Sequence, residues 1–319
     1  MTMLKKFTYP TIFMFIFCFA LPMNAPTKES QTLRLALLPI PDVLPVYVAI
    51  ENGYFDELGL TVEPLAVGSA VERDQLMQAG KADGMINELS GAANFNREKV
   101  QVKIVAVARS PLGNSPLFRI LAAPGSHIKT IKDLAGVPIG ISKNTVIEYI
   151  TTRLLESGGL KPNEIEYQSI PVLPERLQLL LQGQVKAVTL PDPLGVSAVE
   201  AGAVEVVSDL AQKEVSQSVI TFTVDATEEK SELVKNFMIA WNRAAKELNE
   251  HPGKYKALML KKIRVPKNIQ DKFTIPPMPT QVIPSKKQWD DTMSWMLEKK
   301  LINTSLKYED SVTEEFLVQ

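Results

Sequence analysis

The sequence is poor in the side chains that carry most metal and nucleophilic chemistry. Its 319 residues include one cysteine, Cys18, and two histidines, His127 and His251. Disulfides need cysteine pairs, and zinc sites need several cysteine or histidine ligands, so neither is expected. We expect both histidines to be exposed, one in a turn and one at a helix end. The sequence therefore predicts no metal site, no cofactor and no catalytic residue.

An excess of charge of either sign is also missing. The chain has 35 Lys and Arg against 36 Asp and Glu, a formal net charge of -1, and no basic stripe. Nucleic-acid binding needs concentrated positive charge, so nucleic acid is excluded as a main partner. No H-E-x-x-H, G-x-S-x-G or G-x-x-x-x-G-K motif occurs. With 45% hydrophobic and 22% charged residues, the composition is that of a soluble globular protein of two compact units.

The N-terminus carries a targeting signal. Lys5 and Lys6 precede an apolar run, residues 12–21, which is short for a bilayer core of ~30 Å. We interpret residues 1–25 as a cleaved signal peptide, cut after Ala25 or alternatively after Ala20, and predict a periplasmic protein. A retained anchor helix is the alternative. Lipid attachment at Cys18 is less favoured, because bulky Phe17 precedes it.

Short apolar runs alternate with amphipathic stretches, a pattern typical of α/β units with mostly parallel sheets flanked by helices. Helices are expected at 43–52, 71–78 and 147–156, with Asp42 and Ser69 as N-caps of the first two. The expected strands cover residues 33–38, 60–65, 84–86, 102–108, 117–122, 138–141, 165–169, 187–190, 204–207 and 219–224.

Two of these runs, 117–122 and 219–224, follow breaks in the pattern and are interpreted as hinge strands. Residues 123–215 then form an inserted lobe II, and residues 31–122 and 216–319 form a discontinuous lobe I. Trp289, Met293 and Met296 have helix-face spacing and are expected in the core. The proline-rich stretch 265–285 is expected to be a long surface connection.

Four ordered segments stand out along the chain: Pro45–Glu63, with its Gly-Tyr-Phe at 53–55, Gln78–Asp83, Ile131–Gly140 and Leu180–Ala187. Together they resemble nitrate-, sulfonate-, taurine- and thiamine-precursor-type ABC substrate-binding proteins. The resemblance implies a type II periplasmic binding fold of two α/β lobes, two hinge strands and a ligand cleft that closes on binding.

Ligands of parallel sheets bind beyond the carboxyl ends of the strands, which selects the candidate loops. Hydroxyl and amide groups that open a helix can bind a ligand, but the same groups serve as simple helix caps. Three carboxylates in these loops would repel an anion, so a cationic ligand is favoured if two of them line the cleft. The candidate ligand-binding residues are Pro41, Asp42, Gly68, Ser69, Asn87, Glu88, Ser142, Asn144, Thr145 and Asp192.

We therefore predict a non-enzymatic monomer that captures a small polar or heterocyclic solute, such as a sulfonate, nitrate or a thiamine precursor. Its partners would be the permease and ATPase subunits of an inner-membrane ABC importer. One alternative is an enzyme that resembles the menaquinone-pathway dehydratases of the same fold. Another is an exported sensor-input module.

The signal predicts that the mature N-terminus lies between Leu21 and Gln31. N-terminal peptide sequencing of the protein purified from the cell envelope checks this expectation. Recovery of intact Met1 would contradict cleavage.

Overall fold

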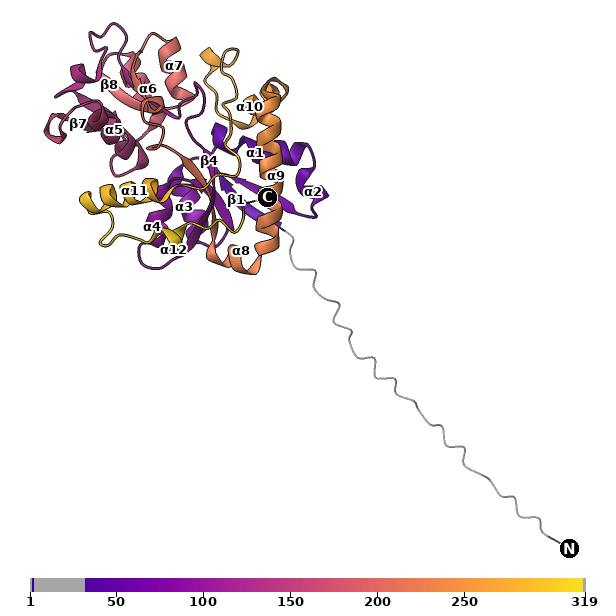
Figure 1. Ribbon diagram of the computed structural model, residues 1–319. Coiled ribbons are helices and arrows are strands. Elements are labelled where there is room, and N and C mark those ends of the chain that lie inside the picture. Colours follow the sequence, from indigo (N-terminus) through magenta and orange to yellow (C-terminus); the bar gives the residue numbers. More distant parts are fainter. Residues whose placement is uncertain (1, 3–31, 318–319) are drawn as a thin grey trace. The chain divides into compact units, whose positions relative to one another are not determined.

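Two five-stranded sheets organise the chain in the computed structural model, which describes residues 2 and 32–317 (Figure 1). The predicted signal peptide, with Cys18 and the cut after Ala25, lies outside the described residues. Each predicted strand is confirmed to within one or two residues at its ends. The strands are β1 (Thr32–Leu37), β2 (Thr61–Ala66), β3 (Gly84–Asn87), β4 (Val102–Arg109), β5 (Phe118–Ala122), β6 (Pro138–Ile141), β7 (Glu166–Ser169), β8 (Ala187–Pro191), β9 (Val204–Ser208) and β10 (Ser218–Thr223).

The strand order is β2-β1-β3-β10-β4 in the first sheet and β7-β6-β8-β5-β9 in the second. Only β10 runs against its neighbours in the first sheet, and only β5 does so in the second. Each reversed strand is the one that the chain enters directly from the other sheet. The sheets are therefore mostly parallel, as predicted.

Helices connect and cover these strands. The α-helices are α1 (Leu44–Glu51), α2 (Tyr54–Glu57), α3 (Ala70–Gln78), α4 (Leu89–Asn96), α5 (Val146–Ser157), α6 (Leu173–Leu181), α7 (Leu194–Glu200), α8 (Val224–Glu229), α9 (Ser231–Glu250), α10 (Lys256–Lys262), α11 (Lys286–Glu298) and α12 (Tyr308–Ser311). The 3-10 turns are η1 (Pro41–Val43), η2 (Ile131–Leu134), η3 (Pro162–Glu164), η4 (Asp209–Ala211), η5 (Pro252–Tyr255) and η6 (Lys267–Ile269).

The first sheet is covered on both faces. Leu33, Leu35 and Leu37 of β1 pack with α1, α2, α9 and α10, whereas Ala36 packs with α3, α4 and α11. This alternation is what a strand buried on both faces requires, because successive side chains point to opposite sides. The long helix α9 closes one face, and its Phe237 stacks on Phe55 with ring centroids 5.6 Å apart.

Tryptophan and methionine side chains fill the core under α11. Trp289, Met293 and Met296 are buried, which confirms their predicted core positions. Around the second sheet, α5 packs on one face with Ile139 and Ile141, and α6 and α7 pack on the other. Each sheet thus forms a layer between helices.

Two short segments, 110–117 and 209–217, carry the chain between the sheets. The strand β5 was expected as a hinge strand at the end of lobe I, but it pairs with β8 and β9 inside the second sheet. The crossing therefore comes before β5. The break in the apolar pattern at Pro111 and Gly113 does mark the position of this crossing. The sheet that β5 joins could not be predicted, because an apolar run does not reveal which strands it pairs with.

The proline-rich stretch 265–285 is not simply a surface connection. Its prolines exclude a regular helix, as predicted. Most of its apolar side chains are nevertheless buried in the core between the first sheet and α9. They include Ile269, Phe273 and Met278. The stretch also reaches α7, because Asn268 Nδ2 donates to the Ser197 carbonyl at 3.1 Å. The stretch therefore connects the core of the first sheet to α7, which covers the second sheet.

A buried carboxylate joins the two crossing segments. Asp209 is fully buried and accepts hydrogen bonds from the N–H groups of Leu117 (3.1 Å) and Phe118 (3.0 Å) and from the Ser216 hydroxyl (2.5 Å). Burial raises the pKa of Asp209 to about 6, although these donors and the charge of Arg109 act to lower it. Asp209 therefore links both segments through a carboxyl group whose pKa is raised to about 6.

Because its folded pKa lies above its ordinary value, Asp209 should favour folding most strongly at low pH. Its contribution to the free energy of unfolding should fall by roughly 1 to 3 kcal/mol as the pH rises from about 4 to about 6. Urea unfolding at several pH values should show this decline relative to Asp209→Asn. The same change at exposed Asp271 is the control, and parallel pH profiles for wild type and Asp209→Asn would contradict the assignment.

Candidate functional site

The predicted loops of the first sheet lie side by side. Pro41 and Asp42 follow β1, Gly68 and Ser69 follow β2, and Asn87 ends β3. These three strands are neighbours in the order β2-β1-β3 and run parallel, so their carboxyl ends share one edge. The structure therefore brings these five residues to one region of the first sheet.

The predicted loops of the second sheet are grouped in the same way. Ser142, Asn144 and Thr145 follow β6, and Asp192 follows the adjacent parallel strand β8. A narrow cavity of ≈ 10 Å³ lies between α4 and α5, the helices that follow β3 and β6, and is lined by Leu89 and Ser90 of α4 and by Val146 and Tyr149 of α5. This gap is about large enough for one water molecule. At this point the two layers are already in contact.

Asp42 does not cap a helix, so that prediction was wrong. It lies in η1, and the N-cap of α1 is Val43 without a side-chain bond. The Asp42 carboxylate instead pairs with Arg109 Nη1 at 3.2 Å, and both side chains are buried. A buried carboxylate needs a countercharge, which the Arg109 guanidinium supplies and a helix cap would not.

Asp192 is paired even more completely. Its two oxygens accept from Arg119 Nε at 2.8 Å and Nη2 at 3.0 Å, a bidentate arrangement. Burial lowers the pKa of Arg119, but the hydrogen bonds and charges of Asp192 and Glu205 outweigh it and raise that pKa. A Cβ on Gly195 would lie 2.7 Å from an Asp192 oxygen, so a glycine there gives the pair its space.

Glu88 and Asn87 lie at the start of α4. A Glu88 oxygen is 3.6 Å from Arg73 Nη2, and Arg73 is buried. Asn87 is buried as well, and its side-chain oxygen accepts from the Thr221 hydroxyl at 2.6 Å. All three carboxylates that would repel an anion therefore face an arginine.

Ser69 is confirmed as the N-cap of α3. Its hydroxyl accepts from the Glu72 N–H at 3.2 Å, and Glu72 in turn accepts from the Gly68 N–H at 2.6 Å. This reciprocal cap satisfies two donors at the helix start. Gly68 and Ser69 thus have a local structural use.

Residues 142–145, which we call the solute loop because solute binding is predicted there, carry a different arrangement. Thr145 caps α5, and its hydroxyl accepts from the Ile147 N–H at 3.2 Å. The Ser142 hydroxyl accepts from Arg176 Nη2 at 2.5 Å and donates to the Pro171 carbonyl at 3.3 Å. Arg176 is fully buried, and burial lowers its pKa to about 10, so it stays charged at neutral pH. Its other donors bind backbone carbonyls.

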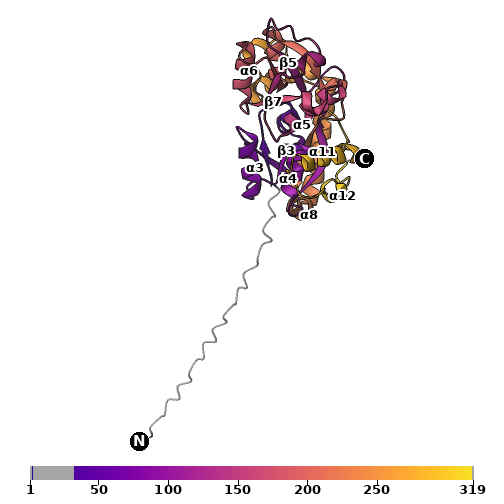
Figure 2. The same ribbon diagram turned by 90° about the vertical axis from the view of Figure 1, so that its left-hand side faces the viewer.

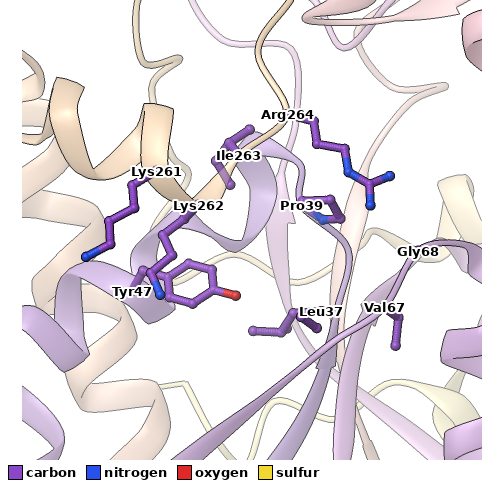
Figure 3. A pocket seen from close by; sticks show the side chains of 10 residues that line it. Leu37, Pro39, Tyr47, Val67, Gly68, Lys261, Lys262, Ile263 and Arg264 are labelled. Carbon is purple, nitrogen blue, oxygen red and sulfur yellow. The ribbon is translucent and has the colours of Figure 1, made fainter.

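A larger cavity of ≈ 340 Å³ opens at the ends of β1 and β2 (Figure 3). Lys261 and Lys262 extend to one side of it and Arg264 to the other. Lys262 Nζ lies 4.8 Å from the centre of the half-buried Tyr47 ring, and burial raises the pKa of the Tyr47 hydroxyl. The remaining lining residues are Leu37, Pro39, Ala66, Val67, Gly68 and Ile263, none of which is acidic.

The chain offers few groups for catalysis here. His127 and His251 are exposed, as predicted, and neither lines these cavities. Within residues 32–317 no group of three or more His, Cys, Asp and Glu side chains could hold a metal ion. No helix among the same residues has the length and apolar character needed to cross a membrane.

This two-lobed α/β arrangement is the fold of periplasmic binding proteins. The Escherichia coli periplasmic aliphatic sulphonate binding protein SsuA has a TM-score of 0.74 and 16% identity, covering 89% of this chain and 92% of that chain. The desulfurization enzyme DSZB has a TM-score of 0.65 and 17% identity, covering 90% and 97%. A binding protein and an enzyme therefore share this fold.

Sequence comparison places the chain more narrowly. The profile of the family described as NMT1/THI5 like matches residues 40–255, which is more than half of the chain. A Brachyspira hyodysenteriae protein named as an ABC transporter periplasmic binding protein is 22% identical over 245 residues, which cover 72% of this chain and 69% of the relative. The chain belongs to the NMT1/THI5-like family.

The Asp192–Arg119 pair yields a stability prediction. Asp192→Ala leaves a largely buried guanidinium without its main partner, which should lower the free energy of unfolding by about 3 kcal/mol. Glu232→Ala removes an exposed pair with Lys235 and should change it by less than about 1 kcal/mol. Urea unfolding at neutral pH measures both. Equal effects would show that burial adds nothing to the Asp192 pair.

Proposed function

We propose that this chain is the solute-binding component of an ABC importer and acts outside the cytoplasmic membrane. The two sheets would form two lobes that close on a solute between the loop groups, pivoting at the crossing segments. Membership of the NMT1/THI5-like family and the ABC transporter relative support this role. The solute would pass, without covalent change, from a monomeric binding protein to the permease and ATPase subunits.

The charge of the solute is inferred from two arginines, Arg176 and Arg264, that have no carboxylate close by in the part of the chain that the structure describes. Among residues 32–317, no carboxylate oxygen lies within ion-pair distance of Arg176, directly behind Ser142, or of Arg264, at the larger cavity. Asp42, Glu88 and Asp192, in contrast, each have an arginine. The preferred solute is therefore a small organic molecule with an anionic group. A sulfonate or a phosphorylated or carboxylated heterocycle fits this description.

Non-enzymatic binding fits the residues better than catalysis does. The only cysteine of the chain is Cys18, and neither His127 nor His251 lines the two cavities, so the residues there offer no cysteine nucleophile and no histidine base. The fold shared with DSZB keeps an enzyme as the second candidate. A sensor-input module would bind solute in the same way and would differ only in its downstream partner.

Ligand binding tests the proposal directly. A thermal-shift panel of taurine, alkanesulfonates, nitrate, pyrimidines, riboflavin and polyamines should give its largest shift with an anion, and calorimetry should then show one site. Arg264→Ala should weaken that binding by about 10- to 100-fold, because hydrogen bonds to a charged group are worth about 1.5 to 3 kcal/mol. The loss should shrink at high salt.

Arg97→Ala is the matched control, since Arg97 is exposed at the far end of α4 and should leave affinity unchanged. A preference for polyamines would contradict the predicted charge of the solute. Recovery of chemically altered solute after long incubation would favour the enzyme instead.

A further inference from the structure

One buried carboxylate holds the unusual backbone of the solute loop. Asn144 has φ 60, in the left-handed region that residues other than glycine rarely adopt. Its N–H donates to Oε2 of Glu148, in the first turn of α5, at 2.6 Å. Glu148 is only 2% exposed, so it cannot turn to solvent in this arrangement. The loop conformation therefore depends on where the Glu148 carboxylate lies.

The second oxygen of Glu148 is bound by a distant part of the chain. Lys299 Nζ forms an ion pair with Glu148 Oε1. Lys299 is the C-cap of α11, which packs on α4 and α12 beside the first sheet, whereas α5 follows β6 of the second sheet. A buried carboxylate is costly without compensation, so Lys299 supplies the charge that lets Glu148 stay in place.

Other contacts join the same two helices without reaching the loop. Asp291 of α11 accepts from the Tyr149 hydroxyl at 2.6 Å and pairs with Arg153 Nη2 at 3.0 Å. The Tyr149 ring packs edge-on against Trp295, with centroids 5.5 Å apart. Figure 1 and Figure 2 show α5 and α11 side by side in both views. Of these contacts, only the Glu148–Lys299 pair continues to the Asn144 N–H.

We infer that Glu148 is a positioning residue that couples the conformation of the solute loop to the contact between α5 and α11. Separation of these helices removes Lys299 and leaves the Asn144 N–H as the one remaining partner of the Glu148 carboxylate among residues 32–317, so the carboxylate is no longer held in place and the loop loses its support. Linkage is reciprocal: a solute bound at the loop stabilises the helix contact, and the contact raises affinity for the solute. This last step rests on the proposed function.

Hydrogen exchange of the full chain without solute tests the coupling. In Lys299→Met, the Asn144 amide should exchange about tenfold faster, the change that corresponds to about 1.4 kcal/mol. Peptides that cover the Ser69 cap should not change. Lys299→Arg keeps the charge and should restore slow exchange. Lys286→Met removes an exposed pair with Asp290 on the same helix and should have no effect.

Solute affinity is then measured by calorimetry with the best anion of the panel, and Lys299→Met should bind it about tenfold more weakly. Unchanged loop exchange in Lys299→Met would overturn the coupling, whether or not a solute is found. Faster exchange with unchanged affinity would overturn the link to solute binding. Faster exchange in a protein that binds no anion would support the structural coupling and count against the proposed function.

Discussion

The arrangement of the site depends on one short stretch, residues 116–118, where the chain first crosses between the sheets. Nearly every polar backbone group of this stretch is bound by a buried side chain or by the opposite loop group. Arg109 donates to the Pro116 carbonyl at 2.9 Å while it pairs with Asp42, and Asp209 accepts from the N–H groups of Leu117 and Phe118. The Leu117 carbonyl accepts from the Asp192 N–H at 2.8 Å. Loops of both sheets are thus held to the same few backbone atoms.

The sequence predicted the strands well because a buried strand leaves a local signal. Each apolar run between turn residues became a strand, and the helix-face spacing of Trp289 correctly predicted a core position. The charges of the site could not be predicted in the same way. Asp42 and Arg109 are 67 residues apart, and Asp192 and Arg119 are 73 residues apart. No periodicity links partners across such distances, so the carboxylates looked unpaired, and Asp42 was taken for a helix cap. The positions of the loops could be predicted from the ends of the strands. The ion pairs within them could be identified only from the three-dimensional structure.

The segments that resemble the family are mostly scaffold. Gly53 adopts φ 73 after α1, and Phe55 is buried against α9. Asp83 accepts from the Arg34 N–H at 2.8 Å and pairs with Lys230, which fixes the start of β3. Gly136 adopts φ 68 two residues before β6. Such residues are needed to form two layers at the right spacing, and they do not touch the solute loop. A resemblance carried by these positions therefore establishes the fold and says little about the ligand.

Charge selection should arise from closure rather than from any one contact. Arg176 is buried behind the solute loop and Arg264 is exposed at the larger cavity. Bringing the layers closer would remove water from around the exposed Arg264 guanidinium, and the desolvation of an ion in a protein costs several kcal/mol. An anion between the layers offsets that cost, since two unit charges 4 Å apart attract by about 4 kcal/mol at the effective dielectric constant of a protein surface. A neutral solute of the same shape offers no such compensation. The protein would therefore distinguish anionic from neutral solutes by whether the two lobes can close around them. An uncharged solute of the same shape would bind to the open form and leave the closed form unpopulated.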